Sequence, residues 1–233
     1  MAGKAILGAA AAAGLMAYAV RGKSSSLLAP SVYKGVSSRR VVALTFDDGP
    51  SEATPVLLDL LSRYEAKATF FECGANVRRL ASVTRQVLEA GHEVGNHSDT
   101  HPFLPFKSPA FIRAELESAQ QSIYDACGTR PRFFRAPFGV RWFGLRAVQK
   151  NLGLLGVMWT SIGVDWKESE TQILQRIFRG ARNGAILCLH DGRQLEVRPD
   201  VRATLGAVKR LLPMLVDQGF HFEKVSEILC PTI

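Results

Sequence analysis

Two adjacent aspartates, Asp47 and Asp48, end a short apolar run in this 233-residue chain. The run over residues 41–44 is rich in valine and predicts a buried strand, which the Gly49-Pro50 pair stops abruptly. Because adjacent carboxylates repel each other, their position at a strand end favours a cation or a proton between them. The same residues are also good turn formers, and taken alone the motif leaves both interpretations open.

Two histidines, His97 and His101, form a second feature with chemical potential. On one side of a helical turn their imidazoles would suit a single divalent ion, although Ser98 stands where the zincin motif needs glutamate. With Asp48 as an oxygen ligand they give the His/His/Asp set of catalytic zinc, which leaves a position open for water. His92 begins the same predicted strand, so we expect it at the opposite end of the strand, in a structural role.

Further polar groups follow other apolar segments, namely Arg135, Asp165 and the pair His190-Asp191. Arg135, beside Asp47, would hold that carboxylate ionised and oriented. An aspartate such as Asp165 near His190 can raise the pKa of the histidine and fix its tautomer, which would make His190 a competent general acid.

The segments that must position these groups alternate between strand and helix patterns. Strands are predicted over 41–46, 67–72, 92–96, 132–135, 154–160, 185–189 and 220–223, and helices over 54–64, 76–89, 109–126, 141–151, 170–182 and 201–218. Seven alternations predict a parallel sheet, either open or closed into a barrel. Since the carboxyl ends of parallel strands share one face, we expect the polar groups to converge on one pocket there.

The composition suits one large domain, because 47% hydrophobic residues are enough for a sizeable core. A formal net charge of +8 favours acidic partners. The basic residues are scattered, however, and no basic stripe interleaved with aromatics is present, which argues against nucleic acid as a partner. The four cysteines show no C-x-x-C spacing and indicate neither a zinc site nor a disulfide framework, so we expect most of them to be buried fillers.

Residues 1–20 have the pattern of a secretory leader. Lys4 precedes an apolar run over 5–20, and Ala17-Tyr18-Ala19 resembles an A-x-A cleavage site. Basic residues on both flanks also allow an uncleaved anchor, so a signal peptide and a signal anchor both stay open. Residues 21–38 are expected to be a linker and 39–230 the catalytic domain, located outside the cytoplasm and either released or tethered to the membrane.

Together these motifs resemble the polysaccharide deacetylase family, also called the NodB homology domain or carbohydrate esterase family 4. The resemblance covers about residues 40–229 and rests on T-F-D-D-G-P, H-S-x-x-H, R-x-P-x-G, D-W and the L-H-D strand end, in the family's order. It implies a distorted (β/α) barrel with about seven parallel strands and the active site at their C-terminal ends. It also implies a hydrolase that removes acetyl groups from sugars.

The resemblance further implies which residues bind a metal ion and which transfer protons. One divalent ion, expected to be zinc with cobalt or nickel also suited, would be bound by Asp48, His97 and His101. Asp47 would be the general base that takes a proton from the attacking water, steadied by Arg135.

On the same resemblance, His190 would protonate the departing amine, assisted by Asp165. The backbone N–H of Phe138 would stabilise the oxyanion. Trp166 and Leu189 are the remaining expected substrate contacts, although Trp166 could equally be a packing residue.

Three positions depart from the family pattern: Ile162 replaces the first aspartate of D-x-x-D-W, Phe138 replaces a tyrosine, and Cys188 replaces a leucine expected to line the acetyl-methyl pocket. We interpret these departures as substrate tuning. The expected substrate is a glycan containing N-acetylglucosamine, of the chitin-oligomer or peptidoglycan type. The alternatives are another acyl group, as in acetylxylan or a formamido sugar, and a catalytically silent sugar-binding module, which would have no use for a complete acid and base.

Overall fold

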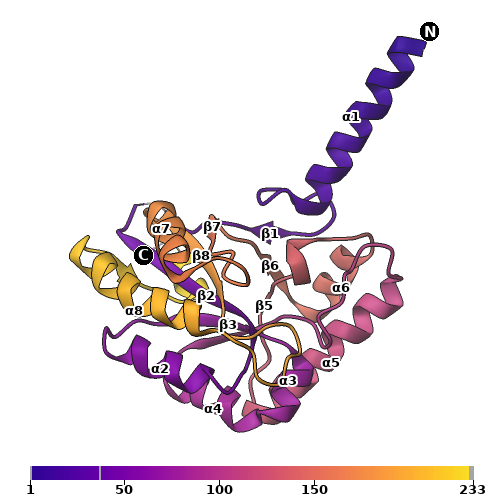
Figure 1. The fold of residues 1–233 in the computed structure, drawn as a ribbon. Helices are drawn as coiled ribbons and strands as arrows, with labels where there is room; N and C mark the ends of the chain where they lie inside the picture. The colour runs from indigo at the N-terminus through magenta and orange to yellow at the C-terminus, as the bar shows by residue number, and fades with distance from the viewer. Residues whose placement is uncertain (1, 37, 231–233) are drawn as a thin grey trace.

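One sheet of nine strands organises the part of the chain that this computed structural model describes, residues 2–36 and 38–230 (Figure 1). The strand order is β1-β6-β5-β4-β3-β2-β8-β7, and β9 pairs with β2 beside this path. The ladders between these strands are all parallel. The predicted parallel α/β architecture is confirmed, and all carboxyl ends of the strands face the same way.

The strands are short except near the centre of the sheet. They are β1 (Ser31–Val32), β2 (Val41–Gly49), β3 (Ala68–Glu72), β4 (Glu93–Asn96), β5 (Phe133–Phe134), β6 (Leu155–Val157), β7 (Ser161–Ile162), β8 (Ala185–His190) and β9 (His221–Phe222). Every residue of β2 and β3 is buried, as expected of parallel strands covered on both faces. The seven predicted strands are present; β1 and β7, two residues each, had no periodicity to reveal them.

The helices are α1 (Ala2–Arg21), α2 (Thr54–Ser62), α3 (Gly74–Arg79), α4 (Ala81–Glu89), α5 (Pro109–Cys127), α6 (Leu145–Leu152), α7 (Glu170–Gly180), α8 (Arg202–Asp217) and α9 (Val225–Leu229), with a 3₁₀ turn η1 (Pro137–Gly139). The six predicted helices are present in the predicted order, and α1 and α9 are additional to them. The helix predicted over 76–89 is two helices, because Leu80 leaves helical geometry at φ −129° and ψ 44°. The helix predicted from residue 141 begins after Gly144, whose φ is +88°.

The largest hydrophobic cluster joins β2, β3 and β8 to α2, α7 and α8. Phe46 and Phe70 stack at its centre with their ring centroids 5.2 Å apart. A second cluster joins α5 and α6 to the β5 side of the sheet. These clusters hold the central strands rigidly, so side chains at the strand ends have fixed positions.

Helix α1 projects away from the domain (Figure 1). Its last turn and the chain that follows it pack against the domain. The backbone N–H of Arg141 donates to Val20 O at 3.0 Å, Ala29 is fully buried, and β1 pairs with β6. The segment expected to be a linker, 21–38, thus carries an edge strand and buried contacts over its described residues. Within the described residues, no helix has both the length and the apolar character needed to cross a bilayer.

Candidate active site

The carboxyl end of β2 carries Asp47 and Asp48, opposite the end of β8. Asp47 lies in register with His190, and the ladder to β3 is irregular between Asp47 and Gly49. Asp48 has φ +71°, a left-handed conformation that aspartate tolerates better than most residues. A Cβ at position 49 would lie 2.6 Å from the carboxylate oxygens of Asp191, so a larger residue there would displace that carboxylate.

Asp48, His97 and His101 converge on one point. Asp48 Oδ1 lies 3.3 Å from His97 Nε2 and 3.1 Å from His101 Nε2, and the three candidate ligand atoms are all within 4.8 Å of one another. The other carboxylate oxygen accepts the backbone N–H of Gln194 at 2.8 Å. Asp48 Oδ1 is buried with no hydrogen-bond partner among the described residues. A carboxylate oxygen facing two imidazole nitrogens, with no proton donor assigned, fits a divalent ion.

Hydrogen bonding prepares this group for a cation. His97 Nδ1 lies 2.8 Å from the carbonyl oxygen of Arg135, so Nδ1 carries the proton and the lone pair of Nε2 points at Asp48. Burial alone would raise the pKa of Asp48, but the imidazoles of His101 and His97, when protonated, and the charge of His190 hold that pKa well below the usual range. Asp48 is therefore an anion at neutral pH, as a metal ligand must be.

The segment from His97 to His101 is a loop, and the expected helical turn is wrong. Ser98 and His101 have φ of +66° and +56°, outside the right-handed helical region. Glu115 of α5 fixes this loop, because its carboxylate accepts the backbone N–H and the hydroxyl of Thr100, each at 2.8 Å. The two imidazoles meet through this irregular backbone, with ring centroids 5.0 Å apart.

Arg135 binds Asp47 in a buried ion pair. Its Nη1 lies 2.6 Å from Asp47 Oδ1, its Nε donates to Val157 O at 3.0 Å, and its guanidinium stacks 4.1 Å from the ring centroid of Phe71. A buried pair of this kind adds little net stability, because desolvation opposes the attraction between the charges. Its effect is to fix the direction of the Asp47 carboxylate.

Cys188 packs behind Asp47, with Sγ 3.5 Å from Asp47 Oδ2. Burial and the neighbouring Asp47 raise the pKa of this thiol well above its usual value, so it is neutral. Asp47, Cys188 and His190 also lie close enough to form a metal site, but a neutral thiol and the guanidinium of Arg135 disfavour a cation there. Leu189 is fully buried in the main core and does not line the cavity, because alternate residues of a strand face opposite sides.

His190 is held by Asp165, which follows β7. His190 Nδ1 lies 2.8 Å from Asp165 Oδ1, and the His190 backbone N–H donates to Asp165 Oδ2 at 2.9 Å. The hydroxyl of Thr204 donates to the same Oδ2 at 2.7 Å. Burial lowers the pKa of His190, but the charge and hydrogen bond of Asp165 outweigh it and raise that pKa to about 9. This imidazole is therefore protonated at neutral pH, with Nε2 left to donate.

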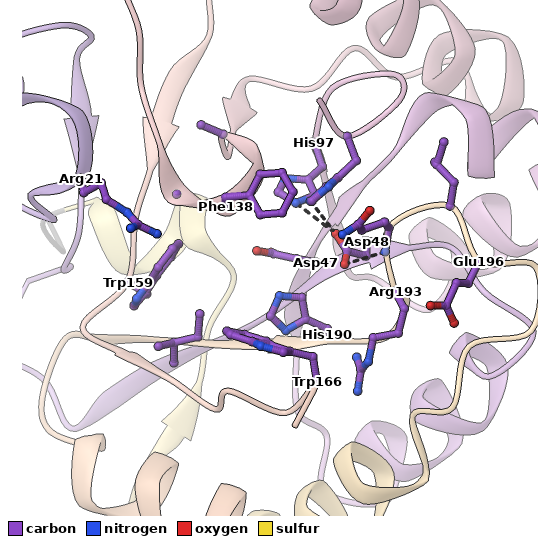
Figure 2. Close-up of a pocket in the computed structure, with 16 residues that line it drawn as sticks. Arg21, Asp47, Asp48, His97, Phe138, Trp159, Trp166, His190, Arg193 and Glu196 are labelled. Carbon is purple, nitrogen blue, oxygen red and sulfur yellow. Dashed lines mark hydrogen bonds and ion pairs between the residues drawn. The ribbon is translucent and has the colours of Figure 1, made fainter. Parts of the chain in front are cut away.

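The strand ends open into a cavity of about 900 Å³ (Figure 2). Figure 2 shows His190 between Asp47 and Trp166, and Phe138 beside His97. The cavity lining includes seven of the predicted site residues: Asp47, Asp48, His97, His101, Phe138, Trp166 and His190. Arg135 and Asp165 lie behind it and support Asp47 and His190. The structure therefore brings together nine of the ten predicted site residues, and Leu189 is the exception.

Phe138 lies at the mouth of this cavity in the 3₁₀ turn η1. Its φ of +57° turns the backbone sharply, and its ring contacts His101 edge-on at 4.6 Å between centroids. Gly139 packs so closely on Trp159 that a Cβ there would lie 2.5 Å from the indole. The backbone of this turn is therefore held near the two histidines.

Sequence reasoning missed several residues of the site. Arg21, Trp159 and Arg193 also line the cavity, and Asn76 donates to the backbone carbonyl of Asp48 at 2.8 Å. Arg193 directly follows the His-Asp-Gly strand end, which could have identified it. Nothing in the sequence indicated that Arg21 belongs to the site, because this residue directly follows the leader pattern.

Two buried carboxyl groups lie behind the site, Glu72 and Asp191. Burial raises the pKa of Glu72 to about 8 and that of Asp191 to about 7. Thr54 donates its hydroxyl to Asp191 and Thr84 donates to Glu72. Since both groups are wholly or partly protonated at neutral pH, they add less negative charge than their residue type suggests.

The strand ends of this parallel α/β sheet combine a His/His/Asp set that could hold a cation, an Asp–Arg pair and a His–Asp pair. This combination is typical of hydrolases. The family model for polysaccharide deacetylase matches residues 34–157. The chain belongs to the polysaccharide deacetylase family, as its motifs predicted.

Individual relatives agree with this assignment. The chain is 35% identical over 205 residues to a chitooligosaccharide deacetylase of Bradyrhizobium sp. (strain ANU 289), covering 84% of this chain and 94% of that protein. It is 34% identical over 206 residues to a peptidoglycan-N-acetylglucosamine deacetylase of Listeria monocytogenes, covering 88% of this chain but only 42% of that protein. A CE4 family pseudoenzyme from Bacillus anthracis superposes with a TM-score of 0.78 at 28% identity, over 88% of this chain and 71% of that one.

Proposed function

We propose that this protein is a metal-dependent hydrolase that removes N-acetyl groups from glycans containing N-acetylglucosamine, of the chitin-oligomer or peptidoglycan type. The main observation that supports this proposal is that three candidate cation ligands, a candidate base and a candidate acid face the same cavity. The chitooligosaccharide and peptidoglycan deacetylases among its relatives support this substrate class.

Asp48, His97 and His101 would hold the metal ion, for which zinc is our first choice and cobalt or nickel are alternatives. When bound, a divalent ion polarises the acyl oxygen and lowers the pKa of the attacking water. The hydrogen bond from His97 Nδ1 to Arg135 O keeps the Nε2 of His97 free for this purpose.

Asp47 is the general base in this proposal, and Arg135 directs its carboxylate toward the attacking water. An Asp47 oxygen and a His190 ring nitrogen lie within 4.8 Å of each other, so base and acid reach the same reacting carbon. The backbone N–H of Phe138 donates to the oxyanion as charge develops on it.

His190 then gives its Nε2 proton to the departing amine, while Asp165 keeps Nδ1 protonated and the ring oriented. Trp166 forms one wall of the cavity beside this acid, with ring centroids 5.3 Å apart. We do not assign Leu189 a substrate contact, since it is buried in the core.

Two alternatives keep the same fold. The same groups could hydrolyse an O-acetyl ester of xylan or a formamido sugar, since Ile162 lines the cavity where the family pattern has aspartate. A silent sugar-binding module is a second alternative, since a pseudoenzyme shares this fold. The complete set of ligands, base and acid favours an enzyme over such a module.

Acetate release from a panel of acetylated glycans tests the proposal. We expect release from chitin oligomers or from peptidoglycan fragments, abolished by a chelator and restored by adding back the divalent ion. Release from acetylxylan alone would favour the ester alternative, and binding without release would favour the silent module.

We further propose that the domain is exported, with residues 1–20 acting as a signal peptide or anchor, 21–38 as the segment that joins it to the domain, and 39–230 as the catalytic part. The leader pattern and the cell-wall substrates of relatives support this location. Protease accessibility on intact cells is the test, and a domain found wholly in the cytosol would refute it.

A further inference from the structure

Arg21, the last residue of α1, reaches the catalytic cavity from outside the matched family region. It lines the cavity together with Trp159, and Figure 2 shows its side chain directed toward that indole. Among the described residues, no acidic side chain forms an ion pair with it. Its guanidinium is thus available to a ligand in the cavity.

The backbone on either side of Arg21 is fixed to the domain. Arg141, 1% exposed, donates from its backbone N–H to Val20 O at 3.0 Å and from its guanidinium to Gly22 O at 2.5 Å. Lys23 Nζ donates to the carbonyl oxygen of Thr160 at 2.8 Å. Arg21 therefore has a defined place beside the cavity, and the contacts named here involve residues that a cut after Ala19 would leave in the chain.

The charges of the cavity are distributed unevenly. Asp47 and Asp48 occupy its catalytic side, and Glu196 lies on the side away from Arg21 (Figure 2). Arg193 also lines the cavity, but its guanidinium donates to Gly192 O at 2.8 Å and to Asp165 O at 2.7 Å. The Arg21 side thus combines an uncommitted cation with the indole of Trp159, against which a sugar ring can pack.

Resting on the proposed function, we infer that Arg21 and Trp159 form a subsite for a carboxylate-bearing sugar next to the acetylated sugar that reacts. A guanidinium binds a carboxylate with two parallel N–H···O bonds, which adds geometric selectivity to charge attraction. The preferred substrate is then an acidic acetylated glycan, such as a peptidoglycan fragment whose muramic acid carries a lactyl carboxylate. Arg141 is the positioning residue of this subsite.

The test compares one glycan in two forms: a peptidoglycan oligosaccharide with free lactyl carboxylates and the same oligosaccharide with those carboxylates converted to methylamides. For the carboxylate form we expect Arg21→Gln to lower kcat/KM about 10-fold, mainly through KM, as for the loss of a charge-assisted hydrogen bond. For the methylamide form, kcat/KM should stay unchanged. Arg63→Gln removes one positive charge at an exposed position outside the cavity lining and should change neither value.

Equal loss on both forms in Arg21→Gln, or no loss on either, would overturn the subsite. The same loss in Arg63→Gln would also overturn it, because the effect would then reflect overall charge. If instead the proposed deacetylase function were wrong, the wild-type protein would release acetate from neither form, so the two failures can be told apart.

Discussion

The carboxylates of Asp47 and Asp48, adjacent in the chain, bind different partners. Asp47 Oδ1 lies 2.6 Å from Arg135 Nη1, whereas Asp48 Oδ1 lies 3.1 Å from His101 Nε2. The left-handed conformation of Asp48, at φ +71°, changes the direction of the chain between them. Two identical side chains thereby enter different electrostatic environments, which allows one to bind a cation and the other to accept a proton.

Removing either kind of metal ligand should empty the cation site. We expect Asp48→Ala and His97→Ala to lose the bound divalent ion, because Asp48 supplies the anionic oxygen and His97 one of two imidazole nitrogens. Elemental analysis of the purified proteins measures the metal content. His92→Ala is the control, since His92 is buried beside Ala68 and outside the cavity lining, and should keep its metal. Full occupancy in His97→Ala would contradict the ligand assignment.

Substitution of the proposed acid and of the proposed base should affect two kinds of substrate differently. An amide needs its leaving amine protonated, whereas an activated aryl acetate expels a stable phenolate unaided. His190→Ala should therefore lose acetate release from N-acetylglucosamine oligomers, on the order of 100- to 10,000-fold, and retain much aryl-acetate hydrolysis. Asp47→Asn should lose both activities while keeping its metal. Steady-state rates on both substrates decide this, and equal losses in His190→Ala would exclude it as the acid.

The pH profile should report the contact between His190 and Asp165. The acid works only when protonated, so activity persists below the pKa of His190, about 9, and falls as pH rises through it. Asp165→Asn removes the charge that raises this pKa and should move the alkaline limb of kcat/KM to lower pH by about 1 to 3 units. Rates on an amide substrate between pH 6 and 10 would measure the shift. If the alkaline limb of kcat/KM does not move, a group other than His190 sets it.

Arg141 should control how firmly the segment after α1 is held. Arg141→Ala removes the donor to Gly22 O and Ser25 O, and each carbonyl left unpaired in a buried place costs about 1 to 3 kcal/mol. We expect tryptic cleavage after Lys23 to become faster, which mass spectrometry measures. We also expect the free energy of unfolding to be lower. Arg146→Ala is the matched control: its exposed guanidinium binds the nearby carbonyl of Leu27, and its loss should have a smaller effect.

The sequence predicted the central fold well because β2 begins with the apolar run 41–44 and β8 is apolar up to His190, as strands buried on both faces are expected to be. Asp47 and His190 follow directly from those runs, since a polar residue at the end of a buried parallel strand must lie at the common edge. The active-site face was therefore predictable without knowledge of any contact.

Other features depend on contacts between distant residues. The loop from His97 to His101 takes its irregular shape from Glu115, which no local pattern connects to it. Arg21 lines the cavity because Arg141 and Lys23 fix the backbone on either side of it. Leu189 was assigned to the substrate on motif similarity, although strand alternation alone places it opposite His190.

Arg135 acts on the site through two different kinds of atom. Its carbonyl oxygen accepts the proton of His97 Nδ1, and its guanidinium holds Asp47. A substitution can remove the guanidinium but leaves the carbonyl in the main chain, so mutational drift at this position can abolish proton transfer while sparing the cation ligands. Under the proposed function, a chain with another residue at position 135 would be expected to lose turnover while its cation ligands stay in place.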